Sequence, residues 1–394
     1  MTATFCLDSR ITDDYLQRIE QRLPTSMNDE RVRRDAQAKV EKLRLWMVQQ
    51  KLDSVLISRY DNFAWLTCGG DNRVLKNTET GAGHLLLTAD RQYLLAYSMD
   101  GERILEEQIP AQGYQLETVR WYEGDPRHLT FKLGGKRIAA DTALPGAEER
   151  TLEIHRLHEP LTELEIDRCR WLGRQSALLL EALARRLHPG MTEEDVARET
   201  QCLYSLHGIE LIVLLVGSDA RAIRLRHSVP SGKRIEKYIL LHPAARRWGL
   251  HANICRSIHF GKPEPGLCQT YHAAATIYAR TLGMLQPSLP FANILAAQKT
   301  WYADLGYTNE WREHFQGGPC GYIPCDPTRC FTAMHVVAGQ AYDWFITLPG
   351  VMSEELALLT ISGIEVASLS PNWPSLAIDT PTSGEIRLPD MIVV

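Results

Sequence analysis

The stretch from Arg226 to Gly261 constrains the fold of this 394-residue chain more than any other segment. It reads RHSVPSGKRIEKYILLHPAARRWGLHANICRSIHFG. A histidine and a proline-containing turn lead into an apolar run, a glycine turn at Gly249 and a second apolar run. Two apolar runs joined by a glycine turn are typical of a β-hairpin. The sequence therefore predicts a hairpin whose strands carry His242 and Asn253, eleven residues apart.

Helices and strands alternate through the first part of the chain. The spacing of apolar residues predicts a helix over about residues 30–52. Short apolar runs bounded by turn residues predict strands at 54–58, 83–89, 91–98 and 136–141. This alternation predicts an α/β domain over residues 1–158.

Pro160 interrupts regular structure before the second part of the chain. Thr162 with Glu165, and Thr192 with Asp195, have the spacing of capping boxes, so each pair is expected to start a helix. The first of these helices is predicted over 163–187. Further strands are predicted at 211–216, 238–244 and 253–260, and further helices at about 266–284 and 291–305. These elements are assigned to a second domain, 159–394.

The composition indicates a soluble, cytoplasmic protein. The net charge is −5 and charged residues make up 23% of the chain, without long runs of one sign, which argues against nucleic-acid or membrane-surface partners. Neither a signal peptide nor an apolar window of about 18 residues is recognisable. Nine cysteines, an odd number, fit reduced thiols. Cys320, Cys325 and Cys330 are spaced five apart, which is not a zinc-knuckle spacing, so inert thiols are expected.

Several segments resemble the pita-bread family, which includes methionine aminopeptidase, aminopeptidase P, prolidase and creatinase. They are the hairpin, the helix starts TELEIDRCRWLGRQSA and LHPGMTEEDVARE, and the strand-and-turn LDSVLISRYDNFAWLTCGG. Their order matches the family over roughly residues 30–390. The resemblance implies an N-terminal creatinase-like α/β domain and a C-terminal pita-bread domain with a curved mixed β-sheet flanked by helices. It also implies a homodimer in which one subunit's N-terminal domain helps to cover the partner's site.

The metal ligands of this family are mostly replaced here. In the metal-dependent relatives an aspartate on each hairpin strand holds divalent cations, and the resemblance places His242 and Asn253 there. It places Gly318 at a histidine ligand, Leu348 at a glutamate ligand, and Glu354 at a ligand that is kept. Because amide and glycine are poor substitutes for charged or imidazole ligands, we expect no metal and no cofactor. The resemblance therefore points to the metal-free, creatinase-like branch.

Three residues are predicted to be catalytic. His227 matches the acid/base histidine of creatinase, and an imidazole pKa near 6.5 suits that role. His314 matches a histidine that contacts substrate in relatives. Glu354 matches a carboxylate that holds a cationic substrate group, with the neighbouring Glu355 as the alternative. A surface histidine and a solvated acid are the ordinary alternatives for these positions.

Other polar residues are expected to line the substrate pocket, with interior packing as the alternative. Arg226 is the first choice among nearby arginines to clamp a substrate carboxylate with two hydrogen bonds. The glycine-rich turn EHFQGGPCGY supplies neutral polar groups. The predicted substrate-binding residues are His242, Asn253, Arg226, Cys255, Tyr322 and Gln316.

The leading hypothesis is a metal-independent hydrolase that cleaves a C–N bond in a small amino-acid-like substrate. The bond would belong to an amide, an amidine or a cyclic amide, with His227 as acid and base. One alternative is a non-catalytic binding protein on the same scaffold. Another is a metal-dependent Xaa-Pro peptidase.

Overall fold

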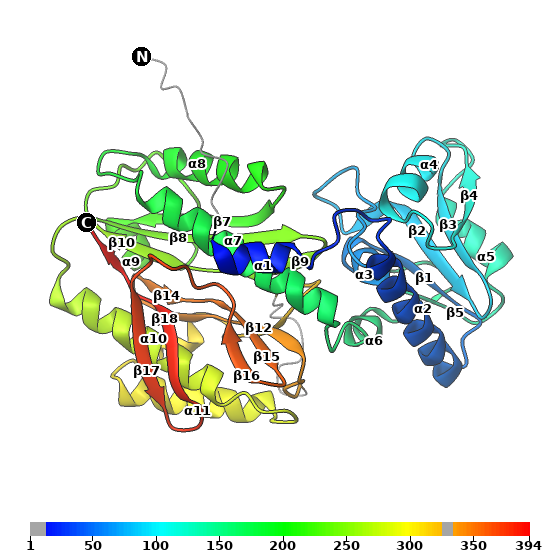
Figure 1. Cartoon of the computed structure of the whole chain (residues 1–394). Coiled ribbons are helices and arrows are strands. Elements are labelled where there is room, and N and C mark those ends of the chain that lie inside the picture. The colour runs from blue at the N-terminus through cyan, green and yellow to red at the C-terminus, as the bar shows by residue number, and fades with distance from the viewer. Residues whose placement is uncertain (1–12, 325–333) are drawn as a thin grey trace, which may run out of the picture. The chain divides into compact units, whose positions relative to one another are not determined.

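The computed structural model describes residues 13–324 and 334–394, which divide into two compact units (Figure 1). The N-terminal unit comprises Leu23–Glu165 and the turn Trp248–Leu250. The C-terminal unit comprises residues 13–22, Ile166–Arg247 and the described residues of His251–Val394. Cys325 and Cys330 lie outside the described residues. Within the described ranges, no helix is long and apolar enough to cross a membrane.

A six-stranded mixed sheet forms the centre of the N-terminal unit, in the order β4-β3-β2-β1-β5-β6 (Figure 1). The strand β1 is buried along nearly its whole length, because α2 and α3 pack on one side of the sheet and Leu129 and Leu133 on the other. The predicted helix and the four predicted strands are present with small shifts at their ends, as α2, β1, β2, β3 and β5, whereas β4 and β6 were not predicted. The elements are α2 (Glu30–Gln50), β1 (Ser54–Arg59), α3 (Tyr60–Leu66), β2 (Thr80–Thr88), β3 (Gln92–Tyr97), β4 (Gln115–Val119), β5 (Ile138–Ala140) and β6 (Glu148–Glu149).

The segment after β1, expected as part of a turn, forms the short helix α3 instead. The turn comes later, where Cys68 and Gly69 adopt positive φ values of 57° and 108°. Left-handed residues commonly end helices, so the glycine signal in this stretch marks the end of a helix.

Both predicted capping boxes are confirmed. The backbone N–H of Thr162 donates to Oε2 of Glu165 (2.7 Å), and the N–H of Glu165 donates to Oγ1 of Thr162 (3.3 Å). Thr192 and Asp195 make the same reciprocal pair. The helices that follow are α7 (Glu163–Ala184) and α8 (Glu193–Leu206).

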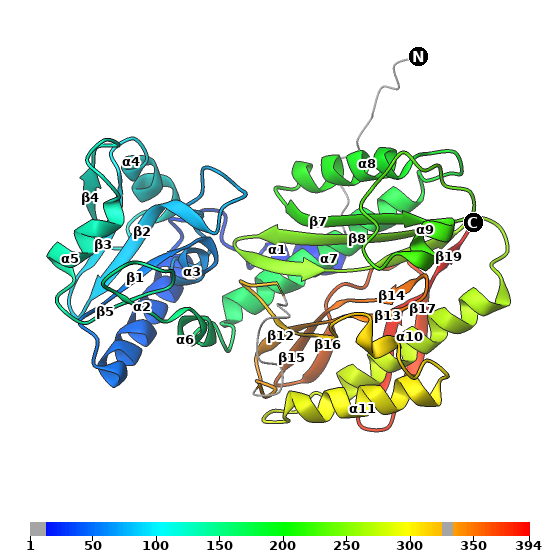
Figure 2. The same cartoon turned by 180° about the vertical axis from the view of Figure 1, so that it is seen from behind.

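The predicted hairpin forms the middle of a five-stranded sheet in the C-terminal unit, with strand order β19-β10-β8-β7 and β9 paired to β8 (Figure 2). Trp248 and Gly249 both have positive φ, as a tight hairpin turn requires. The run predicted as one strand over 253–260 is interrupted, because the N–H of Cys255 bonds to Glu354 instead of continuing the ladder with β8. The strands are β7 (Glu210–Ser218), β8 (Tyr238–Arg247), β9 (Leu250–Asn253), β10 (Arg256–His259) and β19 (Ile392–Val393).

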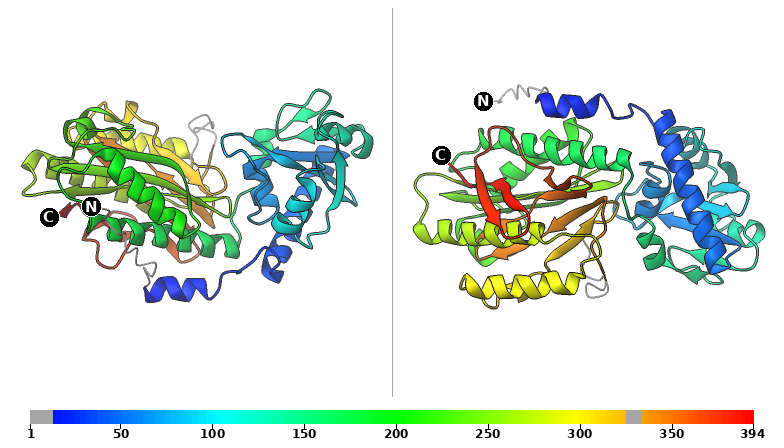
Figure 3. Two further views of the ribbon diagram at one scale, coloured as in Figure 1. Left: turned by 90° about the horizontal axis from the view of Figure 1, so that it is seen from above. Right: turned by 60° about the horizontal axis from the view of Figure 1, so that its bottom comes forward.

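A second, four-stranded sheet has the order β11-β12-β15-β16, and two hairpins flank it. The long helix α10 packs against both hairpins, with α11 beside it (Figure 3). The helices are α10 (Pro265–Gly283) and α11 (Phe291–Asp304), as predicted. The strands are β11 (Gly317–Cys320), β12 (Gln340–Trp344), β13 (Ile346–Leu348), β14 (Val351–Ser353), β15 (Leu356–Thr360), β16 (Gly363–Val366), β17 (Ser375–Thr380) and β18 (Gly384–Pro389).

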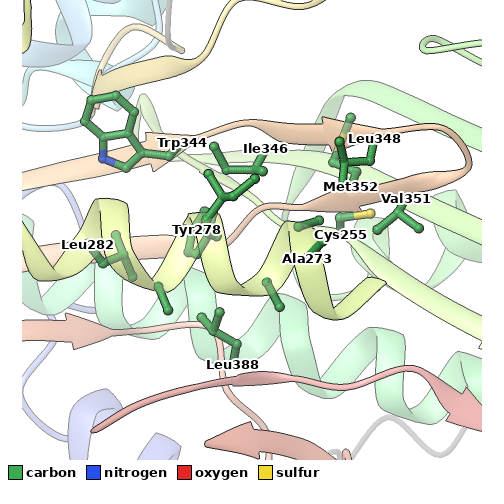
Figure 4. Close-up of a cluster of buried hydrophobic side chains, with 14 of the residues drawn as sticks. Cys255, Ala273, Tyr278, Leu282, Trp344, Ile346, Leu348, Val351, Met352 and Leu388 are labelled. Carbon is green, nitrogen blue, oxygen red and sulfur yellow. The ribbon is translucent and has the colours of Figure 1, made fainter. Parts of the chain in front are cut away.

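The main core of the C-terminal unit lies between α10 and the β13–β14 hairpin (Figure 4). Leu348, at 1% exposure, packs in this core with Tyr278 and Met352. The hydroxyl of Tyr278 is satisfied there: it donates to the carbonyl of Glu355 (2.7 Å) and accepts from its N–H (3.0 Å). Helix α10 thus fixes the backbone just before β15.

Glu355 is part of a buried ion pair. Its Oε1 lies 2.5 Å from Nη1 of Arg256, and its Oε2 accepts from Ser368 Oγ at 2.5 Å. Arg256 also donates to the Ser368 carbonyl at 2.6 Å. Each charged group therefore has a partner, which offsets the cost of removing it from water.

We expect Glu355→Ala to lower the free energy of unfolding by about 3–5 kcal/mol, because it leaves the buried Arg256 guanidinium without its carboxylate. Urea denaturation measures this change. The control is Glu385→Ala, which removes an exposed pair with Arg387 and should cost at most about 1 kcal/mol. An equal loss of unfolding free energy in the two variants would contradict the claim that the buried ion pair stabilises the fold more than the exposed one.

Candidate functional site

His227 and His314 meet edge to face in the C-terminal unit, although 87 residues separate them. His227 lies in the loop between α9 (Asp219–Arg224) and β8, and His314 precedes β11. Their Nε2 atoms are 3.0 Å apart and their ring centroids 5.1 Å apart. His227 is exposed and His314 is half-buried, so the pair presents an imidazole to the surface.

The hydrogen bonds fix the tautomers of this pair. Nδ1 of His314 lies 2.6 Å from the Phe315 carbonyl oxygen, which can only accept, so Nδ1 carries a hydrogen. Burial lowers the pKa of His314 to about 4, so the ring is neutral at pH 7 and its Nε2 accepts. The proton between the rings therefore belongs to Nε2 of His227, and Nδ1 of His227 holds a lone pair. Burial also lowers the pKa of His227, which keeps this ring neutral as well.

Arg226, predicted to clamp a substrate carboxylate, forms an ion pair with Glu310. Glu310 belongs to the short helix η3 (Glu310–Arg312), just before His314. Because Arg226 is adjacent to His227, this ion pair joins the two segments that carry the histidines. Its guanidinium thus supports the histidine pair in this structure.

A second group of polar side chains is buried in the same unit. Nδ1 of His242 lies 2.8 Å from Oε2 of Glu354, and Nδ2 of Asn253 donates to Oδ2 of Asp343. The strands β8, β9 and β12 and the turn before β15 supply these residues. Sequence reasoning predicted His242, Asn253 and Glu354 together, and the structure places them close to one another. It missed Asp343.

Burial dominates the electrostatics of this group. It raises the pKa of Asp343 well above its usual range, and the negative charge of Glu354 adds to the shift. Burial raises the pKa of Glu354 as well, and lowers the pKa of His242 to about 4. Both acids and the imidazole are therefore driven toward their uncharged forms.

Several atoms of this group make no hydrogen bond with an N–H or hydroxyl group of residues 13–324 and 334–394. They are Nδ1 of His242, Oδ1 of Asn253, Oδ1 of Asp343 and both carboxylate oxygens of Glu354. The short approach of His242 to Glu354 thus lacks the alignment of a hydrogen bond. Unsatisfied buried polar groups cost stability, and natural proteins hold few of them. Asp343 and Glu354 can satisfy one another, because the protonated carboxyl of one donates a hydrogen bond to the other.

The other predicted pocket residues lie below the surface. Gln316 donates to the carbonyls of Trp311 (3.1 Å) and His314 (2.7 Å), so it holds the backbone that carries His314. Tyr322 and Cys255 are buried. Burial, and then the charge of Glu354, raise the pKa of the Cys255 thiol well above its usual value, so the thiol stays protonated.

The donors present do not fit the family's two-cation centre. Gly318 has no side chain to donate, and Leu348, which the resemblance places at a glutamate ligand, packs in the core. Asp343, opposite Gly318 across the β11–β12 ladder, carries the second carboxylate instead. In the described part of the chain, no three His, Cys, Asp or Glu side chains are arranged to hold a metal ion.

One sequence signal could have identified Asp343. It is the lone charged residue in the apolar run QAYDWFITL, and all residues of β12 are buried. A charged residue in a buried strand needs a partner or a function.

Comparison with known proteins agrees with this architecture. Residues 39–163 match the creatinase/prolidase N-terminal domain, and residues 167–333 match metallopeptidase family M24. No curated protein matches the chain in a sequence search.

Solved structures share the fold over most of the chain. An Xaa-Pro dipeptidase from Bacillus anthracis is 19% identical, with a TM-score of 0.71 over 91% of this chain and 100% of that one. Dipeptidase PepE from Mycobacterium ulcerans is 17% identical, with a TM-score of 0.72 over 92% and 99%. The N-terminal domain of FACT complex subunit SPT16 from Eremothecium gossypii is 12% identical, with a TM-score of 0.64 over 85% and 96%. Since the two domain models follow one another in the expected order and the solved structures share the fold, this chain has the two-domain architecture of the pita-bread family: a creatinase/prolidase N-terminal domain followed by a metallopeptidase family M24 domain.

Proposed function

We propose that this chain is a metal-independent hydrolase that cleaves a C–N bond in a small amino-acid-like substrate, with His227 as acid and base. The 3.0 Å hydrogen bond between His227 and His314 is the observation that carries the proposal. An exposed, neutral imidazole whose second nitrogen is already bonded to an acceptor is an oriented base.

In the proposed reaction, one proton moves from water to His227 and then from His227 to the leaving nitrogen. Nδ1 of His227 takes a proton from water while the water oxygen bonds to the carbon of the scissile group. The imidazolium formed keeps its Nε2–H bond to His314, which acts as the orienting acceptor. His227 then gives the proton to the leaving nitrogen as the C–N bond breaks. One water molecule is consumed and the enzyme returns to its starting state.

Within the buried group, His242 is proposed to contact the substrate, and the acids to act on His242. His242, at 7% exposure, would polarise the scissile group, and Glu354 would orient the His242 ring from 2.8 Å. Asp343, which accepts a hydrogen bond from Asn253, would share a proton with Glu354 and so hold it in place. Because both acids are buried, they would modulate the histidines without touching a substrate.

The substrate pocket would also be shaped by Arg226, Gln316, Cys255 and Tyr322. Arg226 would contribute the guanidinium N–H groups that are not bonded to Glu310. A small substrate agrees with the names of the structural relatives, several of which are dipeptidases. The homodimer implied by the family resemblance remains part of the proposal.

The first test combines a chelator with a point variant. We expect protein purified with a chelator to hydrolyse small amides or amidines at full rate, and His227→Ala to lower turnover by about 10²–10⁴-fold. His272→Ala removes an exposed histidine of α10 and should leave turnover unchanged. Steady-state kinetics on a panel of amides, guanidino compounds and dipeptides provides the measurement.

Each alternative predicts a different outcome of this test. Activity that disappears with chelator and returns with manganese or cobalt would identify a metal-dependent peptidase, and the name of one structural relative, an Xaa-Pro dipeptidase, suggests the bond it would cleave. Binding of panel compounds without turnover would identify a binding protein on this scaffold. Either result overturns the proposed hydrolase.

The pH dependence of turnover follows from the lowered pKa of His227. The base form is needed, and it persists to lower pH than in a free histidine. We therefore expect the acid limb of kcat/KM to have its midpoint below the ordinary histidine pKa of about 6.5. An acid limb with its midpoint above the ordinary histidine pKa would contradict the assignment.

The charge state of the buried acids can be tested through stability. A carboxyl whose pKa is raised on folding binds more protons in the folded than in the unfolded state, so stability is lost as pH rises above about 4. Asp343→Asn removes this loss. We expect its melting temperature, relative to the unchanged protein, to improve between pH 5 and pH 8 in calorimetry. A difference that is independent of pH would show that Asp343 is ionised in the folded state.

A further inference from the structure

One buried carboxylate holds both ends of the segment that carries His227. Glu193, in the first turn of α8, has an exposed fraction of 0%. Its Oε1 accepts from the N–H and the hydroxyl of Ser218, both at 2.9 Å, where β7 ends. Its Oε2 accepts from the N–H (3.1 Å) and the hydroxyl (2.6 Å) of Ser231, beyond His227.

Arg221, which lies within the segment between Ser218 and Ser231, also binds Glu193. Its Nε lies 3.2 Å from Oε1 and 3.1 Å from Oε2 of Glu193, and its Nη2 donates to the carbonyl of Val229 at 2.8 Å. Every contact made by the Glu193 oxygens is therefore with a donor. Only a deprotonated carboxylate can accept all of these hydrogen bonds.

Next to His227, the segment packs closely against β7. The N–H of Val216 donates to the carbonyl of Ser228 at 2.9 Å. A Cβ atom on Gly217 would lie only 2.7 Å from Oγ of Ser228, so glycine is what lets the loop approach β7 this closely. A shift of either anchored end must therefore move His227.

We propose that Glu193 is a positioning residue that sets the place of His227 relative to His314. It acts through Ser218, Arg221 and Ser231 and does not touch the substrate. Its effect on turnover rests on the proposed function, but its effect on the geometry of the two histidines does not.

The ordinary role of an acid in a first helical turn is to interact with the helix dipole. Glu194, the next residue of the same turn, is exposed and can serve that role equally well. It is therefore the matched control. If the charge at the start of α8 is what matters, variants of both residues should change the His227 titration. If Glu193 positions His227, only the Glu193 variant should change it.

The test compares Glu193→Gln with Glu194→Gln in the full chain. Glutamine has the shape of glutamate, but one of its two terminal groups is an NH₂ donor. This NH₂ group would face the donors of Ser218 or of Ser231, so the hydrogen bonds on that side would be lost. NMR of ¹⁵N-histidine-labelled protein should show the pKa of His227 rising toward its ordinary value as the loop loosens. Turnover should fall about 100-fold, as for a catalytic group displaced by about 1 Å, with a smaller change in KM. Glu194→Gln should alter neither readout.

Ser231→Ala provides a second, milder variant. It removes only the 2.6 Å hydroxyl bond, so an intermediate NMR shift is expected. If Glu193→Gln does not fold, Ser231→Ala decides the outcome. If Glu193→Gln folds and its His227 titration is unchanged, the proposal is wrong. If Glu193→Gln does not fold, an unchanged His227 titration in Ser231→Ala has the same consequence. An equal shift in Glu194→Gln would overturn it as well.

The two proposals can fail separately. If His227→Ala keeps full activity while Glu193→Gln still shifts the His227 titration, the proposed hydrolase mechanism is wrong and the positioning role stands.

Discussion

The hydrogen bond between His227 and His314 is the interaction on which the candidate site depends, because it joins two segments that are distant in sequence. Phe315 sets the tautomer of His314, which in turn sets the tautomer of His227. Around this bond, Glu193 holds one segment and Gln316 holds the other. A surface pair of neutral rings would otherwise be mobile, since one hydrogen bond contributes only about 1 kcal/mol. The rigidity comes from the buried anchors.

Two adjacent acids illustrate how the same side chain can behave differently in two buried surroundings. Glu355 meets Arg256 and Ser368, so both of its oxygens are satisfied. Glu354 is equally buried but lies beside His242 and the carboxyl of Asp343, which burial drives toward their uncharged forms. The first arrangement keeps an ion pair in the core, whereas the second holds its acids and its imidazole uncharged.

Local patterns in the sequence were sufficient for most of the fold. The hairpin around Gly249 and the capping boxes at Thr162 and Thr192 depend on residues close together in the chain, and the structure confirms them. Asp343 was missed because its role depends on pairing between strands that the sequence separates widely. Glu193 was missed for a similar reason: its partners, at Ser218 and Ser231, become neighbours only after folding.

The hydroxyl of Tyr278 bonds to both the N–H and the carbonyl of Glu355 and so fixes the chain between β14 and β15. This clamp decides which of the two neighbouring acids faces Arg256 and which faces His242. An inserted or deleted residue between Ser353 and Leu356 would exchange their surroundings. Evolution can therefore vary the identity of residues in this stretch far more readily than its length, and libraries for new substrates should keep its spacing constant.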